Sequence, residues 1–89
     1  MELGCFDGKT LDFLPPVGTY AGFDAGWGGG LEVGRRERSA ANVSFHEAQS
    51  PADLFGLYDV IICMETLEHV PLKYTEAFIA KFSETRLSP

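Results

Sequence analysis

Cysteine and basic residues are few in this chain of 89 residues, and each scarcity excludes a class of protein. Two cysteines are too few for a disulfide framework, so Cys5 and Cys63 are predicted to be reduced thiols that pack as small apolar side chains. Seven basic residues stand against 13 acidic ones, for a net charge of −6. This balance argues against nucleic-acid binding, because phosphate contacts need cations. The local cluster Arg35, Arg36 and Arg38 is interpreted as the solvated face of a helix.

Long apolar runs are also missing. No stretch approaches the length that crosses a bilayer, and the N-terminus lacks a basic segment followed by a hydrophobic one. We therefore expect no membrane span and a cytoplasmic location. With 45% hydrophobic residues, the chain is expected to form one small globular unit.

Strand-like and helix-like segments alternate along the chain, which predicts βαβ units and an α/β fold with a parallel sheet. Strands are expected at 1–3, 19–24, 43–46 and 58–64, and helices at 9–14, 31–41 and from Pro71 onward, with a helical turn at 52–55. The segment 58–64 is almost continuously apolar, so it is expected to be a strand buried on both faces. Helical spacing predicts a core-facing stripe of Tyr74, Ala77, Phe78 and Phe82.

A turn with two glycines follows the first strand-like residues, in the order Glu2-Leu3-Gly4-Cys5-Phe6-Asp7-Gly8. Glycine lets a ligand approach the backbone, and an acid beside the turn favours ammonium and hydroxyl groups over a pyrophosphate. Asp24 is expected at the tip of the second strand, where a carboxylate can accept hydrogen bonds from both ribose hydroxyls. A helix-capping role for Asp24 is the alternative. The strand ends therefore predict a nucleoside site.

The glycine turn resembles motif I of class I methyltransferases, with Glu2, Gly4 and Gly8 in matching positions and Phe6 at the middle glycine. The segment 58–71, Tyr-Asp-Val-Ile-Ile-Cys-Met-Glu-Thr-Leu-Glu-His-Val-Pro, is similar to the fourth strand and following loop of the same family, especially its ubiquinone-biosynthesis O-methyltransferases. The resemblance spans nearly all of this chain but only the first half of the family's fold. It implies a Rossmann-like parallel sheet truncated to about four strands, with 1–89 as a partial methyltransferase domain. We expect a fragment or a truncated gene product.

The resemblance implies S-adenosyl-L-methionine as the cofactor, with its contacts at the strand ends. The cofactor-binding residues that it implies are Glu2, Gly4, Cys5, Phe6, Gly8, Asp24, Ala25, Trp27, Glu47, Ala48, Met64 and Glu65. The first turn would line the methionine end, Asp24 would bind the ribose, and Glu47 and Ala48 would contact adenine. Backbone carbonyls of Met64 and Glu65 would meet the amino group. Trp27 keeps two interpretations, a cover over the adenine or ribose and an ordinary loop tryptophan.

Glu65, Glu68 and His69 would share one face if their segment is helical. A similar Glu-x-x-Glu-His binds a divalent ion in metal-dependent small-RNA 2′-O-methyltransferases. Three roles stay open for these residues: binding Mg or Mn, acid/base chemistry or hydrogen bonding toward the substrate, and a purely structural network. His69 is the candidate general base, because histidine accepts a proton near neutral pH.

The leading prediction is methyl transfer from S-adenosylmethionine to an oxygen, nitrogen or carbon of a small-molecule acceptor. The alternatives are metal-dependent RNA 2′-O-methylation, a nicotinamide-binding domain and a non-catalytic cofactor-binding fragment. The apolar strand 58–64 would end the sheet with an uncovered edge, which favours pairing with other chains. We therefore expect the isolated chain to be inactive and to self-associate through this edge.

Overall fold

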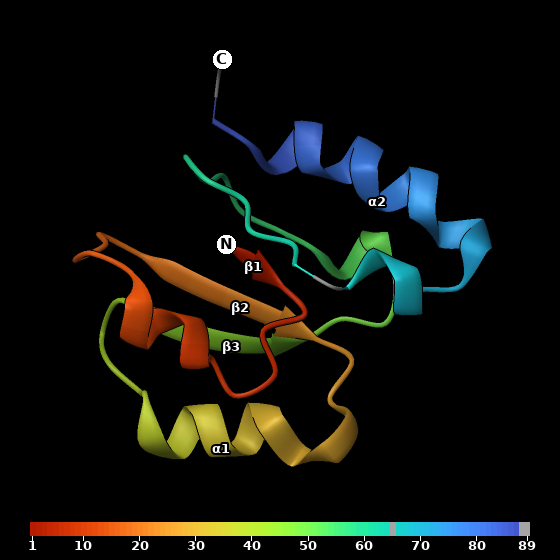
Figure 1. Cartoon of the computed structure of the whole chain (residues 1–89). Helices are drawn as coiled ribbons and strands as arrows, with labels where there is room; N and C mark the ends of the chain where they lie inside the picture. Colours follow the sequence, from red (N-terminus) through yellow and green to blue (C-terminus); the bar gives the residue numbers. More distant parts are fainter. Residues whose placement is uncertain (65, 88–89) are drawn as a thin grey trace.

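Three parallel strands and two flanking helices make up the computed structural model, which describes residues 1–64 and 66–87. The strands β1 (Glu2–Leu3), β2 (Tyr20–Asp24) and β3 (Val43–Glu47) lie in the order β1-β2-β3. The helices α1 (Gly30–Glu37) and α2 (Leu72–Thr85) lie on opposite sides of the sheet (Figure 1). The connections contain four short 3₁₀ helices: η1 (Lys9–Phe13), η2 (Trp27–Gly29), η3 (Pro51–Asp53) and η4 (Leu67–His69). The predicted α/β fold with a parallel sheet is confirmed.

The central strand β2 divides the core into two clusters, because successive strand residues point to opposite faces of a sheet. On the α2 side, Leu3 and the fully buried Phe23 pack in one cluster with Phe78. On the α1 side, Tyr20 packs with Phe45 and with the buried thiol of Cys5. Both cysteines are free, as predicted, with Cys63 half-buried. None of the helices in the described ranges could span a bilayer.

The segment 58–64 is not the strand that its apolar run predicted. It runs beside β1, where Leu3 N–H donates to the Ile62 carbonyl at 2.9 Å and Ile62 N–H donates to the Met1 carbonyl at 2.9 Å. A longer ladder cannot form, because β1 has only two residues. The expected burial on both faces is also wrong, since Val60 is 63% and Met64 61% exposed. The sheet of the described chain therefore has three strands rather than four.

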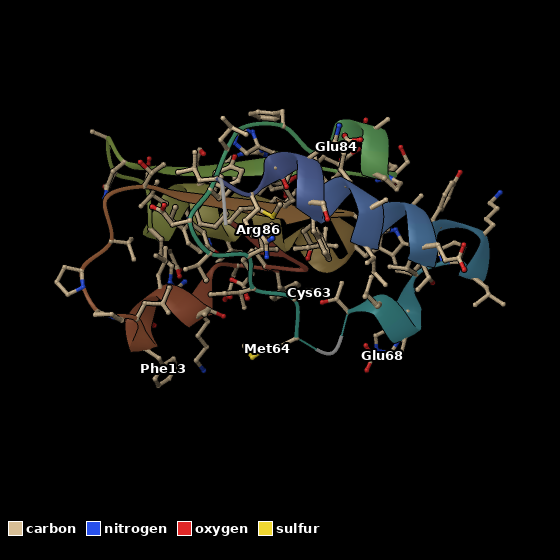
Figure 2. All side chains as sticks on the ribbon, turned by 90° about the horizontal axis from the view of Figure 1, so that it is seen from above. Phe13, Cys63, Met64, Glu68, Glu84 and Arg86 are labelled. Carbon is tan, nitrogen blue, oxygen red and sulfur yellow. The ribbon has the colours of Figure 1, made fainter. Side chains whose placement is uncertain are left out.

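The two helices depart from prediction in their ends and faces. The helix α1 ends at Glu37 rather than at position 41, and the N–H of Arg38 closes its last turn on the Gly34 carbonyl at 2.8 Å. In α2, Phe78 is buried as predicted, but Ala77 is exposed. Neighbouring helix residues point about 100° apart, so Ala77 is turned away from the face that Phe78 buries. Viewed from above, α2 lies across the sheet, and Phe13, Met64 and Glu68 project at the periphery (Figure 2).

Candidate functional site

A cavity of about 400 Å³ lies at the carboxyl ends of the strands. Its wall comes from the turns after all three strands and from the segment that leads into α2. The lining residues are Leu3, Gly4, Asp24, Ala25, Trp27, Ala48, Gln49, Thr66, His69, Val70, Pro71 and Phe78. Ligands of parallel α/β sheets bind outside these strand ends, so we call this space the strand-end cavity.

A second cavity, of about 570 Å³, opens at the opposite ends of the strands. Apolar side chains such as Leu14, Leu57 and Val60 form much of its wall, and Asp59 supplies the one carboxylate among its lining residues. The strand-end cavity is smaller but brings together an acid, an amide, a hydroxyl and an imidazole. Binding sites need such convergent polar groups within an apolar wall, so the strand-end cavity is the better candidate.

Asp24 lies at the tip of β2 and joins the turns that follow β1 and β2. Its Oδ2 accepts a hydrogen bond from Phe6 N–H at 2.8 Å, and its Oδ1 accepts one from Gly26 N–H at 2.9 Å. The N-cap residues of η2 and α1 are Gly26 and Gly29, so Asp24 does not take the helix-capping role. A carboxylate has about four acceptor positions, which leaves Asp24 able to accept two further hydrogen bonds from a ligand.

Glu2 points into the α1 side of the sheet and does not line the strand-end cavity. Its Oε1 accepts a 2.5 Å hydrogen bond from the Tyr20 hydroxyl, and its Oε2 accepts one from the Thr10 hydroxyl at 2.8 Å. Burial, together with this carboxylate, raises the pKa of Tyr20 above its ordinary value. The structure therefore places the first acid of the glycine turn in a buried polar cluster.

The two glycines of the first turn have different neighbours. Gly4 has φ +80° and borders the cavity, where a Cβ atom would collide with the hydroxyl oxygen of Thr66. Gly8 has φ +78° and faces the core, where a Cβ atom would lie 2.6 Å from the Phe45 ring. Both positions favour glycine because of their positive φ. The group that lies close to Gly8 is therefore the Phe45 ring of the core, whereas the resemblance implied the cofactor.

Cys5 and Phe6, the two residues between these glycines that were predicted to bind the cofactor, also lie outside the cavity wall. The Cys5 thiol is buried against β2, and burial raises its pKa to about 12. Phe6 is half-exposed and has a φ of +49°, which is uncommon for a residue with a side chain. The structure thus brings one of the five predicted turn residues, Gly4, to the cavity.

The turns after β2 and β3 supply more of the predicted contacts. Ala25, Trp27 and Ala48 all border the cavity, whereas Glu47 is exposed and lies outside its wall. Trp27 is 82% exposed, so it stands at the rim of the cavity with its indole largely in solvent. Both interpretations of this residue therefore stay open.

Gln49 borders the cavity, where Glu47 was predicted. Its Nε2 donates to the Ala25 carbonyl at 2.8 Å, and its backbone N–H donates to Asp53 Oδ2 at 2.8 Å. These bonds hold the side chain between the turns after β2 and β3. In the sequence, its position just after β3 could have indicated that Gln49 belongs to the site. The third strand was predicted to end at position 46, whereas β3 ends at Glu47.

The segment that would bind a metal is described only in part, because Glu65 lies outside the described residues. Glu68 and His69 belong to η4, and only His69 borders the cavity. Glu68 is exposed and projects outward (Figure 2). Within the ranges 1–64 and 66–87 no group of three His, Cys, Asp or Glu could hold a metal ion. The metal site stays a prediction that depends on Glu65. Met64 lies outside the cavity wall.

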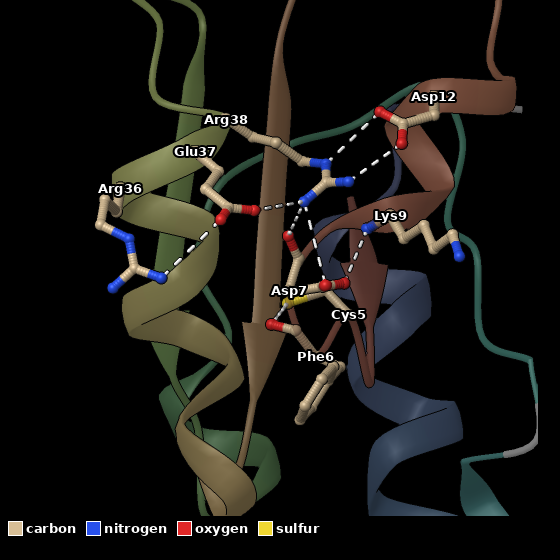
Figure 3. Close-up of polar contacts among 8 residues, drawn as sticks. All are labelled: Cys5, Phe6, Asp7, Lys9, Asp12, Arg36, Glu37 and Arg38. Carbon is tan, nitrogen blue, oxygen red and sulfur yellow. Dashed lines mark hydrogen bonds and ion pairs between the residues drawn. The ribbon is translucent and has the colours of Figure 1, made fainter.

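Arg38 holds the turn after β1 against the end of α1 (Figure 3). Its Nη2 lies 2.9 Å from Asp12 Oδ2, and its Nη1 donates to the Asp7 carbonyl at 3.2 Å. The guanidinium lowers the pKa of the Asp12 carboxyl below its ordinary value. Arg35 and Arg36 are both exposed, and Arg35 also donates to the Phe45 carbonyl at 2.8 Å. The interpretation of all three arginines as a solvated face is therefore wrong for Arg38, because distant acidic residues fold back onto it.

No family model, curated protein or solved structure matches this chain. A function is therefore indicated by the cavity and by the sequence motifs that meet at its wall. Its wall offers acceptor groups at Asp24, a proton acceptor at His69 and accessible apolar surface at Val70 and Pro71. This combination suits a ligand with an apolar ring system and vicinal hydroxyls.

Proposed function

We propose that this chain binds S-adenosyl-L-methionine in the strand-end cavity and forms the cofactor-binding part of a class I methyltransferase that acts on a small molecule. One observation carries the proposal. Residues implied by the resemblance converge on this cavity from four separate turns, and they are Gly4, Asp24, Ala25, Trp27, Ala48 and His69.

The lateral order of the segments supports a Rossmann-like arrangement. The segment 58–64 lies beyond β1, which extends the order to β3, β2, β1 and this segment. Beyond it comes the chain after α2, where Tyr58 N–H donates to the Thr85 carbonyl at 2.7 Å and Leu87 N–H donates to the Tyr58 carbonyl at 2.8 Å. Arg86 pairs with Tyr58 in parallel. The same order, 3-2-1-4-5, begins the 3-2-1-4-5-6 strand order of the Rossmann fold.

The residues present fit the nucleoside half of the cofactor. Asp24 retains acceptor positions for the two ribose hydroxyls, and Val70 and Pro71 offer accessible apolar surface for a purine ring. At the amino-acid half, Gly4 and Thr66 border the cavity, whereas Glu2 and Gly8 face the core. The cavity residues therefore match the nucleoside half of the cofactor better than its amino-acid half.

The bound cofactor would supply a methyl group activated by its positively charged sulfur. The chain would hold the cofactor so that an acceptor can approach the methyl carbon in line, and much of the rate would come from this positioning. His69 in the cavity wall would take the proton that an acceptor hydroxyl or amine releases as its bond to the methyl carbon forms. The pocket for the acceptor is not assigned to residues of this chain.

Calorimetric titration of the 89-residue chain with S-adenosylhomocysteine and with NAD tests the proposal. Binding of S-adenosylhomocysteine without binding of NAD is the expected result. Binding of NAD alone would favour the nicotinamide alternative, and binding of neither would contradict the proposed site. Metal-dependent methyl transfer to RNA by a full-length protein that contains this chain would favour the metal-dependent alternative.

A further inference from the structure

The backbone amides of the turn after β1 are nearly all used within the protein. Phosphate-binding turns instead leave such N–H groups free to point at the ligand. Here five donors are engaged: Gly4 and Cys5 on the Phe23 carbonyl at 2.7 and 3.2 Å, Phe6 on Asp24 at 2.8 Å, Gly8 on the Cys5 carbonyl at 2.8 Å and Lys9 on Asp7 at 3.1 Å. Most N–H groups of this turn are therefore not available to bind a phosphate chain.

The Phe6 side chain fills the space between this turn and the start of α1. A Cβ atom at Gly30 would lie 2.5 Å from Phe6 Cδ1, and one at Gly28 would lie 3.3 Å from Phe6 Cε1. The ring therefore lies directly on Gly28 of η2 and on Gly30, the first residue of α1, on the side of the turn away from Arg38 (Figure 3). It covers the helix end toward which an anion would be drawn.

The charged groups around the turn also disfavour a phosphate chain. Asp24 borders the cavity and accepts a hydrogen bond from the Phe6 amide, so one carboxylate stands where a phosphate chain would approach. The Asp7 carboxylate lies on the other side of the turn, 3.9 Å from Arg38 Nη1. Arg38 is held by Asp12 and by the Asp7 carbonyl. Desolvating a phosphate beside the Asp24 carboxylate is unfavourable because like charges repel.

From these contacts we infer that Phe6 is a specificity-determining residue that closes the site to ligands with a phosphate chain. The strand-end cavity then selects a nucleoside or a nucleoside thioether over nucleoside diphosphates and dinucleotides. The inference rests on the proposed function, since it concerns ligand choice at the same cavity. It assigns the selection to the Phe6 ring and the engaged amides rather than to Glu2, which is buried on the α1 side.

Adenosine and ADP form the matched pair of probes, because they differ only in the diphosphate. Their affinities are measured by calorimetry on the unmodified chain and on Phe6→Gly, which keeps the positive φ and empties the space over Gly28 and Gly30. We expect the unmodified chain to prefer adenosine by about tenfold or more, and Phe6→Gly to lose most of this preference through tighter ADP binding. Phe13→Ala removes an exposed aromatic ring from η1 and should leave the preference unchanged.

Equal affinity of the unmodified chain for the two probes would overturn the inference, as would an unchanged preference in Phe6→Gly. If Phe6→Gly is unfolded by circular dichroism, Phe6→Asn replaces it, because asparagine tolerates a positive φ. Failure of the unmodified chain to bind adenosine and S-adenosylhomocysteine would contradict the proposed function. In that case the Phe6 variant still decides the inference. If it binds ADP and the unmodified chain does not, exclusion by Phe6 is supported, and if neither binds ADP, the inference is overturned.

Discussion

The Tyr20 hydroxyl donates a 2.5 Å hydrogen bond to Glu2 Oε1 in the interior of the protein, where the two residues are 3% and 4% exposed. They lie on neighbouring strands, since Glu2 pairs with Gly22 in the register of β1 and β2. The remaining carboxylate oxygen accepts a bond from Thr10 in η1. The acid that the resemblance implied for the cofactor thus connects the first two strands to the first 3₁₀ helix.

Tyr20→Phe should lower the free energy of unfolding by about 1.5 to 3 kcal/mol, because a buried carboxylate loses one of its two donors. Tyr58→Phe is the control, since its hydroxyl donates to the neutral and exposed Phe55 carbonyl. This variant should lose about 0.5 to 1.5 kcal/mol at most. Urea denaturation of both variants measures the difference. Equal losses in the two variants would show that the hydrogen bond to Glu2 stabilises the protein no more than an exposed hydrogen bond does.

Asp24→Ala should weaken the binding of S-adenosylhomocysteine by about 1.5 to 3 kcal/mol, the usual contribution of hydrogen bonds to a charged group. Asp24→Asn keeps one carbonyl oxygen and should retain part of the affinity. Asp59→Ala removes an exposed carboxylate at the opposite ends of the strands and should bind normally. Calorimetry on the three variants tests the assignment, and normal affinity in Asp24→Ala would remove this residue from the site.

Substitution at Gly8 should affect stability first, and any loss of binding should follow from that. A Cβ atom there would lie 2.6 Å from the Phe45 ring at a φ of +78°, so Gly8→Ala should cost about 1 to 3 kcal/mol in the free energy of unfolding. Gly8→Val should cost more. Gly18→Ala has nothing within 4 Å of its new Cβ and should be nearly neutral. Thermal denaturation compares them, and a fully stable Gly8→Ala would contradict the close packing of Phe45 on this glycine.

The Cys5 thiol should make the protein less stable in alkali. Burial raises its pKa from an ordinary 9.0 to about 12 in the folded protein. Between these values the unfolded chain releases the thiol proton and the folded protein keeps it, so the unfolded state is increasingly favoured as pH rises. This one group should lower the free energy of unfolding by up to about 1.4 kcal/mol per pH unit.

Cys5→Ala isolates this contribution, because Tyr20, Tyr58 and Cys63 also have raised pKa values and remain in both proteins. The variant should be somewhat less stable at pH 7 and should show a shallower decline above pH 9.0. Urea denaturation at several pH values measures both slopes. Identical slopes would mean that the Cys5 thiol ionises equally in the folded and unfolded chains.

The isolated chain should self-associate through the segment 58–64. Within the described residues, the backbone groups of Ile61 and Cys63 have no hydrogen-bonded neighbour, and Val60 and Met64 are exposed beside them. Open apolar edges of this kind pair with other chains. Met64→Lys should reduce association in analytical ultracentrifugation, whereas Leu72→Lys, an equal change of charge on α2, should not. An equal effect of both variants would indicate a general response to charge.

The same preparation tests the expectation that the isolated chain is inactive. We predict no enzyme-like methyl transfer to small-molecule acceptors. A monomeric chain that transfers methyl groups at such rates would contradict both this expectation and the predicted self-association.

The sequence by itself determined the elements whose signals are local. β-prone residues that end in an acid predicted β2 and placed Asp24 at its tip, and alternating faces predicted β3. Both signals can be read along the chain. Helical spacing likewise predicted that Phe78 faces the core. Parallel strands with known ends then indicated that a site lies at their carboxyl edge.

Tertiary structure decided every feature that depends on a distant neighbour. The two-residue length of β1 limits pairing with 58–64. The hydrogen bond from the Tyr20 hydroxyl holds the Glu2 carboxylate in the interior, and the Phe45 ring leaves no room for a side chain at Gly8. Arg38 meets Asp12 only after the chain has folded. Composition and spacing report what a segment favours alone, whereas these outcomes depend on which side chains the fold brings within a few ångströms of one another.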